Sequence, residues 1–336
     1  MEKLSVVLLN FNGQHHLKNF LPSVTQYSKP YQVVVVDNGS TDDSVAFIES
    51  SYPDVQLIKF KENHGFSGGY NKALGLLDSE YVVLLNTDVE VTPNWINPVL
   101  EQLESSEDIK AAQPKILDQK AKEYFEYAGA SGGYIDDLGY PLCRGRIFQT
   151  IEKDNGQYDE AGEVFWASGS CLFVDRKTYL DLGGLDVDFF AHMEEIDLCW
   201  RIWRSHYRIM VVPKSTVYHV GGGTLDKSKP KKTYLNFRNG LSLLIKNEDG
   251  LKLIWKLPLR IFLDWVALIK FSIESGPQHG LAILKAHIHT LIHFSKTFKK
   301  REALKNHPKI PRLKGWIIIS YFVSGRKKYS QLRKET

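Results

Sequence analysis

The segment FFAHMEEIDLCWR gathers three carboxylates in a predicted helix over about residues 193 to 206. Helical spacing places Glu194 and Asp197 on one face with Arg201, whereas Glu195 points elsewhere. The aromatic neighbours make the surroundings partly apolar, and such surroundings raise carboxylate pKa values and suit a general base. The structural alternative is a well-formed helix start, because acidic residues favour the first turn and Asp197 can pair with Arg201.

Two other segments contain side chains that could bind a metal ion. Asp88 follows Asn86 at the end of the apolar run YVVLLNTD, and His219 lies in YHVGGGT after a later predicted strand. Carboxylate and amide oxygens suit Mg²⁺ or Mn²⁺, and a histidine at a strand end beside open backbone can be a further ligand. The alternatives are that Asn and Asp simply close a strand and that the histidine is a packing residue.

A buried-looking strand also ends in a carboxylate, in the stretch VVVVDNGSTDDS at residues 33 to 44. The carboxylate of Asp37 could accept a hydrogen bond from the imide N–H of a uracil or thymine base. Its alternative role is to cap the helix that follows, for which Ser40, Thr41 and Asp42 compete.

These residues must be positioned by the elements around them. Apolar runs predict strands at residues 5 to 9, 32 to 37, 55 to 60 and 81 to 88, with helical patterns between them. This alternation predicts an α/β fold with a mostly parallel sheet flanked by helices. Ligands bind beyond the carboxyl ends of parallel strands, where the sequence places Asn10, Asp37 and Asp88.

Several classes of protein are excluded or disfavoured. The chain has no GxxxxGK[ST] motif, and HGFSGG at residues 64 to 69 is not GxGxxG, so neither a P-loop ATPase nor a dinucleotide-binding dehydrogenase is indicated. Residues 109 to 165 are rich in Gly, Tyr and Asp and predict long loops with short strands, a composition typical of functional loops.

Taken together and in order, these motifs resemble the family 2 inverting glycosyltransferases with the Rossmann-like GT-A fold. The matching pieces extend over about residues 3 to 225 and are VVLLNFNG, VVVVDNGSTDDS, NHGFSGGYNKAL, LLNTDVEV, WASGSCLFVDR, GGLDVDFFAHMEEIDLCWR and VYHVGGGT. Within the family the pattern is most similar to rhamnosyltransferase-like enzymes of bacterial surface polysaccharide synthesis.

The resemblance implies roles on the donor side of the site. Asp37 is expected to contact the nucleobase and Asp88 to hold the metal ion that bridges the donor diphosphate, with His219 as a further metal ligand. The remaining residues expected around the nucleotide are Asn10, Asn12, Asn63, Gly68 and Asn71. The usual metal motif is DxD, and here Asn86 replaces its first Asp, so metal binding is expected to depend more on His219.

The resemblance also implies roles on the acceptor side. Glu195 falls at the position of the catalytic base, with Glu194 and Asp197 as acidic neighbours, although the base of the family is usually Asp. The acceptor side of the pocket is expected at Trp166, Ser168 and Gly169.

Charge divides the chain into two predicted regions. Residues 1–225 hold 19 Lys and Arg against 32 Asp and Glu, whereas residues 226–336 hold 24 against 7, a net charge of +17. We therefore expect a nucleotide-sugar glycosyltransferase domain followed by a basic helical region. In that region Lys252, Lys256, Arg260 and Asp264 form a narrow polar stripe on an apolar helix that is expected to be interrupted near Pro258.

That basic amphipathic region could pack on the catalytic domain or lie on an anionic membrane surface. Nucleic-acid binding is disfavoured, because no RNA-binding module motif is present. The apolar run near the start is six residues long, too short for a signal peptide, and the three dispersed cysteines suit reduced thiols. The expected location is therefore the cytoplasm, with peripheral attachment at the inner face of the membrane as an option.

The function predicted is inverting, metal-dependent transfer of a sugar, with rhamnose as one candidate, from a UDP- or dTDP-sugar. The acceptor is expected to be a saccharide or a lipid-linked molecule, and the cofactor Mg²⁺ or Mn²⁺. Two alternatives stay open: a nucleotidyltransferase, and a nucleotide-binding scaffold of a glycan-synthesis complex.

Overall fold

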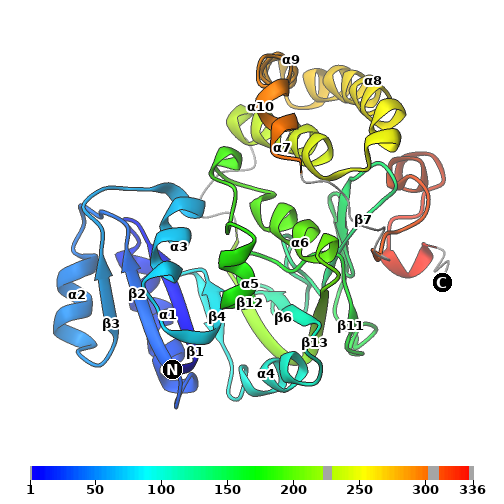
Figure 1. Ribbon diagram of the computed structural model, residues 1–336. Helices are drawn as coiled ribbons and strands as arrows, with labels where there is room; N and C mark the ends of the chain where they lie inside the picture. The colour runs from blue at the N-terminus through cyan, green and yellow to red at the C-terminus, as the bar shows by residue number, and fades with distance from the viewer. Residues whose placement is uncertain (1, 222–228, 302–309, 333–336) are drawn as a thin grey trace.

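A mixed sheet forms the centre of the computed structural model, which describes residues 2–221, 229–301 and 310–332. Its strands are β1 (Glu2–Asn10), β2 (Gln32–Asp37), β3 (Gln56–Lys59), β4 (Ser79–Leu85), β5 (Val89–Val91), β6 (Ile109–Asp118), β11 (Gly162–Glu163), β12 (Cys171–Asp175) and β13 (Arg208–His219). They follow the order β11-β13-β6-β12-β4-β1-β2-β3, and β5 pairs with β13. Figure 1 shows this sheet running through the lower part of the molecule.

The amino-terminal strands β3, β2, β1 and β4 are all parallel, as the apolar runs predict. They are connected by α1 (Gln14–Tyr27), α2 (Ser44–Ser51) and α3 (Gly65–Gly75). Strands β1, β2 and β4 are buried on both faces, so their sequences are continuously apolar rather than alternating. The register aligns Asn10 with Asp37, which brings both side chains to one edge of the sheet.

The prediction of loops from residue 109 onward is wrong at its start, because β6 is a ten-residue strand inside the sheet. Polar residues and Pro114 obscured it. A proline is tolerated in such a strand where the ladder is irregular. The register between β6 and β13 shifts next to Pro114, where residues 213–215 of β13 are passed over.

The rest of the predicted loop region forms a small antiparallel sheet. Its strands are β7 (Gly133–Ile135), β8 (Pro141–Cys143), β9 (Arg146–Ile147) and β10 (Thr150–Ile151). The carboxy-terminal segment packs on it, with Ile317 and Leu332 buried against Leu142 and Ile147. Asp136 fixes this contact by accepting the N–H of Ile317 at 2.9 Å.

Helices cover the sheet and then continue into a separate cluster. Helix α4 (Asn97–Glu104) packs with α1 and α2 in one core of the sheet, and α5 (Arg176–Asp181), the 3₁₀ turn η1 (Val187–Phe189) and α6 (Glu194–Arg204) pack with α3 in the other. The basic region contains α7 (Pro230–Asn247), α8 (Gly250–Glu274), α9 (Pro277–Ile292) and α10 (Phe294–Lys299), which gather at the top of Figure 1, and the short turns η2 (Ile319–Val323) and η3 (Tyr329–Gln331).

Three features of this region bear on the sequence predictions. The expected domain boundary after residue 225 and the end of the VYHVGGGT motif lie outside the described residues. The expected interruption near Pro258 is wrong, because α8 runs through this residue. Among the described residues, no helix is both long enough and apolar enough to cross a bilayer.

Candidate active site

Asn10 and Asp37 meet at the carboxyl ends of β1 and β2. The side-chain amide of Asn10 donates to Asp37 Oδ1 at 3.3 Å, and Asp37 Oδ2 accepts the backbone N–H of Ser40 at 3.0 Å. Asp37 therefore stabilises the turn after β2, but it does not cap the helix that follows, because α2 begins at Ser44 with Asp43 at its N-cap position. Both residues are buried, and Asn10 Oδ1 has no hydrogen-bond partner among the described residues.

The loop after β2 is held by side chains from its neighbours. Asn12 lies in the left-handed region with φ of 51°, and its Oδ1 accepts the N–H of Thr41 at 2.7 Å. Asn38, which the sequence analysis did not single out, donates to Asn63 Oδ1 at 3.0 Å, and the same oxygen accepts the N–H of Gly65 at 2.7 Å. Asn12 and Asn63 thus shape the predicted nucleotide side of the rim.

Helix α3 contains Gly68 and Asn71, two more residues predicted to line the nucleotide site, and their surroundings differ. A Cβ on Gly68 would lie 3.3 Å from the Cβ of His64, a tight but local contact. Asn71 makes three hydrogen bonds: its Oδ1 accepts from the hydroxyl of Tyr179 and from the N–H of Leu185, and its Nδ2 donates to the Leu185 carbonyl at 2.8 Å. Asn71 therefore ties α3 to the chain before α6.

Asp88 and His219 approach each other, although they are far apart in sequence. Pairing of β5 with β13 aligns Val89 with His219, and this places His219 Nε2 3.2 Å from Asp88 Oδ1. The amide of Asn86 lies 3.5 Å from the same ring nitrogen. Burial would raise the pKa of Asp88, but the hydrogen bond and charge of His219 hold it below its usual range.

A third carboxylate, Glu126, lies behind the histidine and was missed by sequence reasoning. Its Oε1 is 3.4 Å from His219 Nδ1, while its Oε2 accepts the N–H of Ala128 at 2.6 Å. Burial lowers the pKa of His219, but Glu126 and Asp88 outweigh it and raise that pKa to about 10. Carboxylate–histidine pairs of this kind orient an imidazole so that its other nitrogen faces a metal ion.

Asp88 and His219 together suit a divalent cation whose remaining ligands come from the substrate. Asp88 offers a carboxylate oxygen, which suits Mg²⁺ or Mn²⁺, and His219 offers an imidazole nitrogen, which suits Mn²⁺. Across residues 2–221, 229–301 and 310–332, no cluster of three or more His, Cys, Asp or Glu side chains is arranged to hold a metal. Substrate phosphates and water would therefore complete the coordination.

The acidic helix α6 begins after a strained loop. Phe190, His192 and Met193 all have positive φ, a conformation that is uncommon for these residues and that clusters at functional sites. Glu194 is buried and Glu195 is partly buried, and neither Oε2 has a hydrogen-bond partner within the described chain.

Burial has different consequences for the two glutamates. It raises the pKa of Glu195 to about 7, although the backbone N–H groups at the helix start oppose the shift. Burial and the neighbouring Glu195 raise the pKa of Glu194 well above its usual range. A carboxylate with a pKa near 7 can take up a proton near neutral pH, as a general base must, and this describes Glu195.

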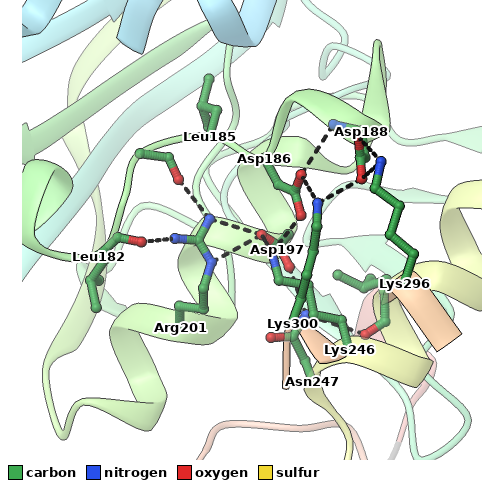
Figure 2. Close-up of polar contacts among 12 residues, drawn as sticks. Leu182, Leu185, Asp186, Asp188, Asp197, Arg201, Lys246, Asn247, Lys296 and Lys300 are labelled. Carbon is green, nitrogen blue, oxygen red and sulfur yellow. Dashed lines mark hydrogen bonds and ion pairs between the residues drawn. The ribbon is translucent and has the colours of Figure 1, made fainter. Parts of the chain in front are cut away.

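Asp197 does not belong to this acidic pair, and its expected place in the catalytic set is not supported. It is fully buried and its carboxylate is occupied: Arg201 and Lys246 lie at 2.8 and 2.9 Å, and Asn247 donates at 2.7 Å. Burial opposes ionisation, but Arg201 and Lys246 hold the pKa of Asp197 below its usual value. The predicted pairing with Arg201 is confirmed (Figure 2).

Gly169 connects the two halves of the site. A Cβ on Gly169 would lie 3.6 Å from the Cβ of Glu195, so this backbone passes directly beside the predicted base. The next residue, Ser170, accepts the N–H of Asn86 at 3.0 Å through its carbonyl. The segment containing Gly169 therefore joins the base at α6 to the predicted metal-binding turn after β4.

The other two predicted acceptor residues are buried. Ser168 donates its N–H to Gln113 at 2.8 Å and shares a 2.9 Å hydroxyl contact with Ser170. Trp166 is only 2% exposed, packs over Gly133 and donates its indole N–H to the carbonyl of Tyr134 at 3.0 Å. Trp166 therefore supports the wall from behind, and direct contact of its ring with an acceptor is not supported.

Helix α7 holds the strained loop in place from the basic region. The side-chain amide of Asn239 donates to the carbonyls of Phe189, Ala191 and His192 at 2.7 to 3.0 Å. Arg238 donates to the Phe189 carbonyl as well, at 2.5 Å. Sequence reasoning missed both residues, because nothing local in the helix sequence indicates a partner fifty positions away.

A network of ion pairs continues this connection to α10. Lys300 contacts Asp186 at 2.6 Å and Asp188 at 2.7 Å, Lys296 contacts Asp188 at 2.7 Å, and Lys246 joins Asp186 to Asp197 (Figure 2). All of these side chains except Asp197 border a cavity of about 140 Å³ between η1, α7, α9 and α10. The basic region is therefore bonded directly to the chain that precedes α6.

Comparison with known proteins gives consistent results. A family model described as "Glycosyl transferase family 2" matches residues 5–171. An N-acetylglucosaminyl-diphospho-decaprenol L-rhamnosyltransferase of Mycobacterium tuberculosis is 26% identical over 273 residues, which are 76% of this chain and 88% of the relative.

Solved structures share the fold. The crystal structure of S. aureus TarS 1-349 superposes with a TM-score of 0.56 at 15% identity, covering 88% of this chain and 83% of that chain. The structure of GalNAc-T7 with UDP, GalNAc and Mn²⁺ gives a TM-score of 0.58 at 14% identity, covering 93% of this chain and 59% of that chain. The mixed α/β sheet flanked by helices is thus the GT-A arrangement expected from the sequence.

Proposed function

Over residues 5–171 the chain belongs to glycosyl transferase family 2, and from this premise we propose that it transfers a sugar from a UDP- or dTDP-linked donor to a saccharide or lipid-linked acceptor. The observation that carries the proposal is the segment at Gly169, which lies beside Glu195 and is followed by the hydrogen bond to Asn86. A base and a donor-binding turn that contact the same segment from different elements suit a single displacement with inversion.

In this mechanism Glu195 acts as the base. Its carboxylate accepts the proton of an acceptor hydroxyl while the hydroxyl oxygen bonds to the anomeric carbon. The bond from that carbon to the donor diphosphate breaks, and the nucleoside diphosphate leaves with the electron pair. Mg²⁺ or Mn²⁺, held by Asp88 and His219, would supply positive charge at the leaving diphosphate. Asp37, Asn10, Asn12 and Asn63 would border the nucleotide.

The donor and acceptor are suggested by the relative of 26% identity. Its name describes an L-rhamnosyltransferase that acts on a diphospho-decaprenol-linked sugar. We extend this to rhamnose as a candidate sugar and to a lipid-linked acceptor here. The proposed arrangement is a transferase domain up to about residue 225 and a basic helical region after it, in the cytoplasm and peripheral at the inner face of the membrane.

Metal-dependent nucleotide binding tests the donor side. Calorimetric titration with UDP, dTDP and GDP is expected to show binding of UDP or dTDP that requires Mn²⁺ or Mg²⁺. Asp88→Ala should weaken this binding by about 10-fold or more, because it removes the carboxylate that would hold the metal. Asp54→Ala, which changes an exposed carboxylate, is the matched control.

Binding without any metal effect would contradict the roles of Asp88 and His219. Binding with no donor hydrolysis or sugar transfer would favour the scaffold alternative, and nucleotide transfer to a sugar phosphate would favour the nucleotidyltransferase.

The contact between Glu126 and His219 gives a second test that needs no turnover. Glu126→Gln should lower the apparent affinity for Mn²⁺, read from the metal dependence of nucleotide binding, by about 10- to 100-fold, because outer partners orient a ligating imidazole. Glu123→Gln, three residues earlier and exposed, should leave the affinity unchanged. An unchanged Mn²⁺ affinity in Glu126→Gln would show that Glu126 does not position His219.

A further inference from the structure

Helix α8 buries three charged side chains against the rest of the protein. Lys256 contacts Glu248 at 2.7 Å, Arg260 donates to the carbonyl of Leu138 at 2.7 Å, and Asp264 lies 3.3 Å from His287. Three of the four residues of the polar stripe expected from the sequence therefore face the protein, whereas Lys252, at the start of the helix, is exposed. Buried charges need partners of this kind, and here they have them.

The opposite face of α8 is apolar and open to solvent. Its exposed large side chains recur at helical spacing and are Leu251, Ile254, Trp255, Phe262, Trp265, Val266, Ile269 and Ile273. A helix on the surface of a globular protein usually shows the reverse pattern, with its apolar residues facing the core and its charged residues facing solvent. Isolated exposed apolar residues are ordinary, but a continuous row along 25 residues marks an interaction surface.

Neighbouring elements add to this apolar surface. Helix α9 packs beside α8, where Trp265 donates to His287 at 3.1 Å, and Lys270 lies 5.7 Å from the ring of Phe322 in η2. Both elements expose further large apolar side chains, namely Leu281, Leu284, Ile288, Leu291 and Ile292 in α9 and Ile319, Phe322 and Val323 in η2. Figure 1 shows α8 and α9 at the outer edge of the molecule.

The charge around this surface is positive. Residues 226–336 carry a net charge of +17, and exposed cations at or near these elements include Lys252, Lys285, Lys299, Arg326, Lys327 and Lys328. Apolar side chains with cations suit a bilayer whose headgroups are anionic, and each cation near such a surface adds to the attraction. No described helix is suited to span the bilayer, so the surface would lie in the interface.

We propose that the outward apolar face of α8 and α9 is a membrane-docking surface that lies in the headgroup region of an anionic bilayer. The proposal rests on the proposed function only for the lipid-linked acceptor, which this attachment would bring within reach. The same region contacts the chain before Glu195 through Asn239, which bonds the Ala191 carbonyl, and through Lys246, which pairs with Asp186. Membrane docking and positioning of the proposed base would therefore depend on the same helices.

Vesicle sedimentation tests the surface with the full chain. The protein is expected to pellet with vesicles of phosphatidylcholine and phosphatidylglycerol, and much less with phosphatidylcholine alone or in high salt. Ile269→Glu, at a site 61% exposed, should lower vesicle affinity by about 10-fold or more, because it places a charge in the interface. Ile254→Glu, 72% exposed near the other end of α8, should do the same.

The matched control is Leu76→Glu, an equally exposed leucine (64%) after α3, which should bind vesicles like the unchanged protein. Nucleotide titrations run in parallel should give unchanged binding for all three variants. Vesicle binding that is unaffected by Ile269→Glu and Ile254→Glu, or equal on neutral vesicles, would overturn the proposal.

A stable dimer in light scattering that both substitutions dissociate, together with no vesicle binding, would also overturn it in favour of a second copy of this chain. Loss of nucleotide binding with intact vesicle binding would instead count against the proposed function alone.

Discussion

Glu195→Gln is expected to lower the rate of sugar transfer by about 100-fold or more, because an amide cannot accept the proton of the acceptor hydroxyl. The substitution keeps the size of the side chain. The backbone of Gly169 lies beside Glu195, and no described group bonds to Glu195 Oε2, so little else should change. Calorimetric binding of the nucleotide should therefore persist while initial rates of transfer collapse.

The rate of sugar transfer by the unsubstituted protein should depend on pH through the ionisation of Glu195. Glu195 works only when ionised, and burial raises its pKa to about 7. Activity is therefore expected to rise with pH through about 7 and to level off above it, and the residual activity of Glu195→Gln should lack this step.

Glu194→Gln is the matched control for the base. Burial and Glu195 raise the pKa of Glu194 well above its usual range, which favours the uncharged form, so an amide should be tolerated far better here than at Glu195. Full transferase activity in Glu195→Gln, with the loss in Glu194→Gln, would move the role of base to Glu194.

Asp197→Ala is expected to lower the free energy of unfolding by about 3–5 kcal/mol, because it leaves buried cations without their partner. Asp197 is fully buried and joins Arg201 of α6 to Lys246 of α7, with Asn247 as a further donor (Figure 2). Urea denaturation followed by circular dichroism measures the change.

The chain provides a control with the same spacing. Asp181 pairs with Lys177 four residues earlier in an exposed position, and exposed pairs of this kind contribute little to stability. Asp181→Ala should leave the denaturation midpoint nearly unchanged. Equal, small changes in the two variants would mean that the contact between α6 and α7 does not depend on Asp197.

Local spacing was enough to predict the parts of this molecule that local physics determines. The strands β1, β2 and β4 follow from short continuous apolar runs, and the rim position of Asn10 and Asp37 follows from the ends of two of those runs. The pairing of Asp197 with Arg201 follows from their spacing of four residues on a helix. Strand β6 was missed because its polar residues and Pro114 are tolerated only through an irregular partner strand.

Long-range contacts account for what the sequence did not show. Glu126 contacts His219 across a separation of 93 residues in the sequence (219 minus 126), and Lys246 contacts Asp197 across a separation of 49 residues. For α8, the pattern identified a polar stripe but not which side would be buried, since both outcomes have the same periodicity. That choice depends on Leu138 and Glu248, which supply partners for its cations.

The side-chain amide of Asn239 bonds three backbone carbonyls of the loop before Glu195, and so one residue of α7 supports the conformation of that whole loop. The family model matches residues 5–171, whereas the loop before Glu195 is held in its left-handed form by α7, which begins at Pro230. Strained backbone persists only where its surroundings over-determine it. The proposed nucleotide residues and the support of the proposed base therefore lie on separate stretches of the chain, so that a change in α7 could disturb the loop before Glu195 without touching Asn10 or Asp37.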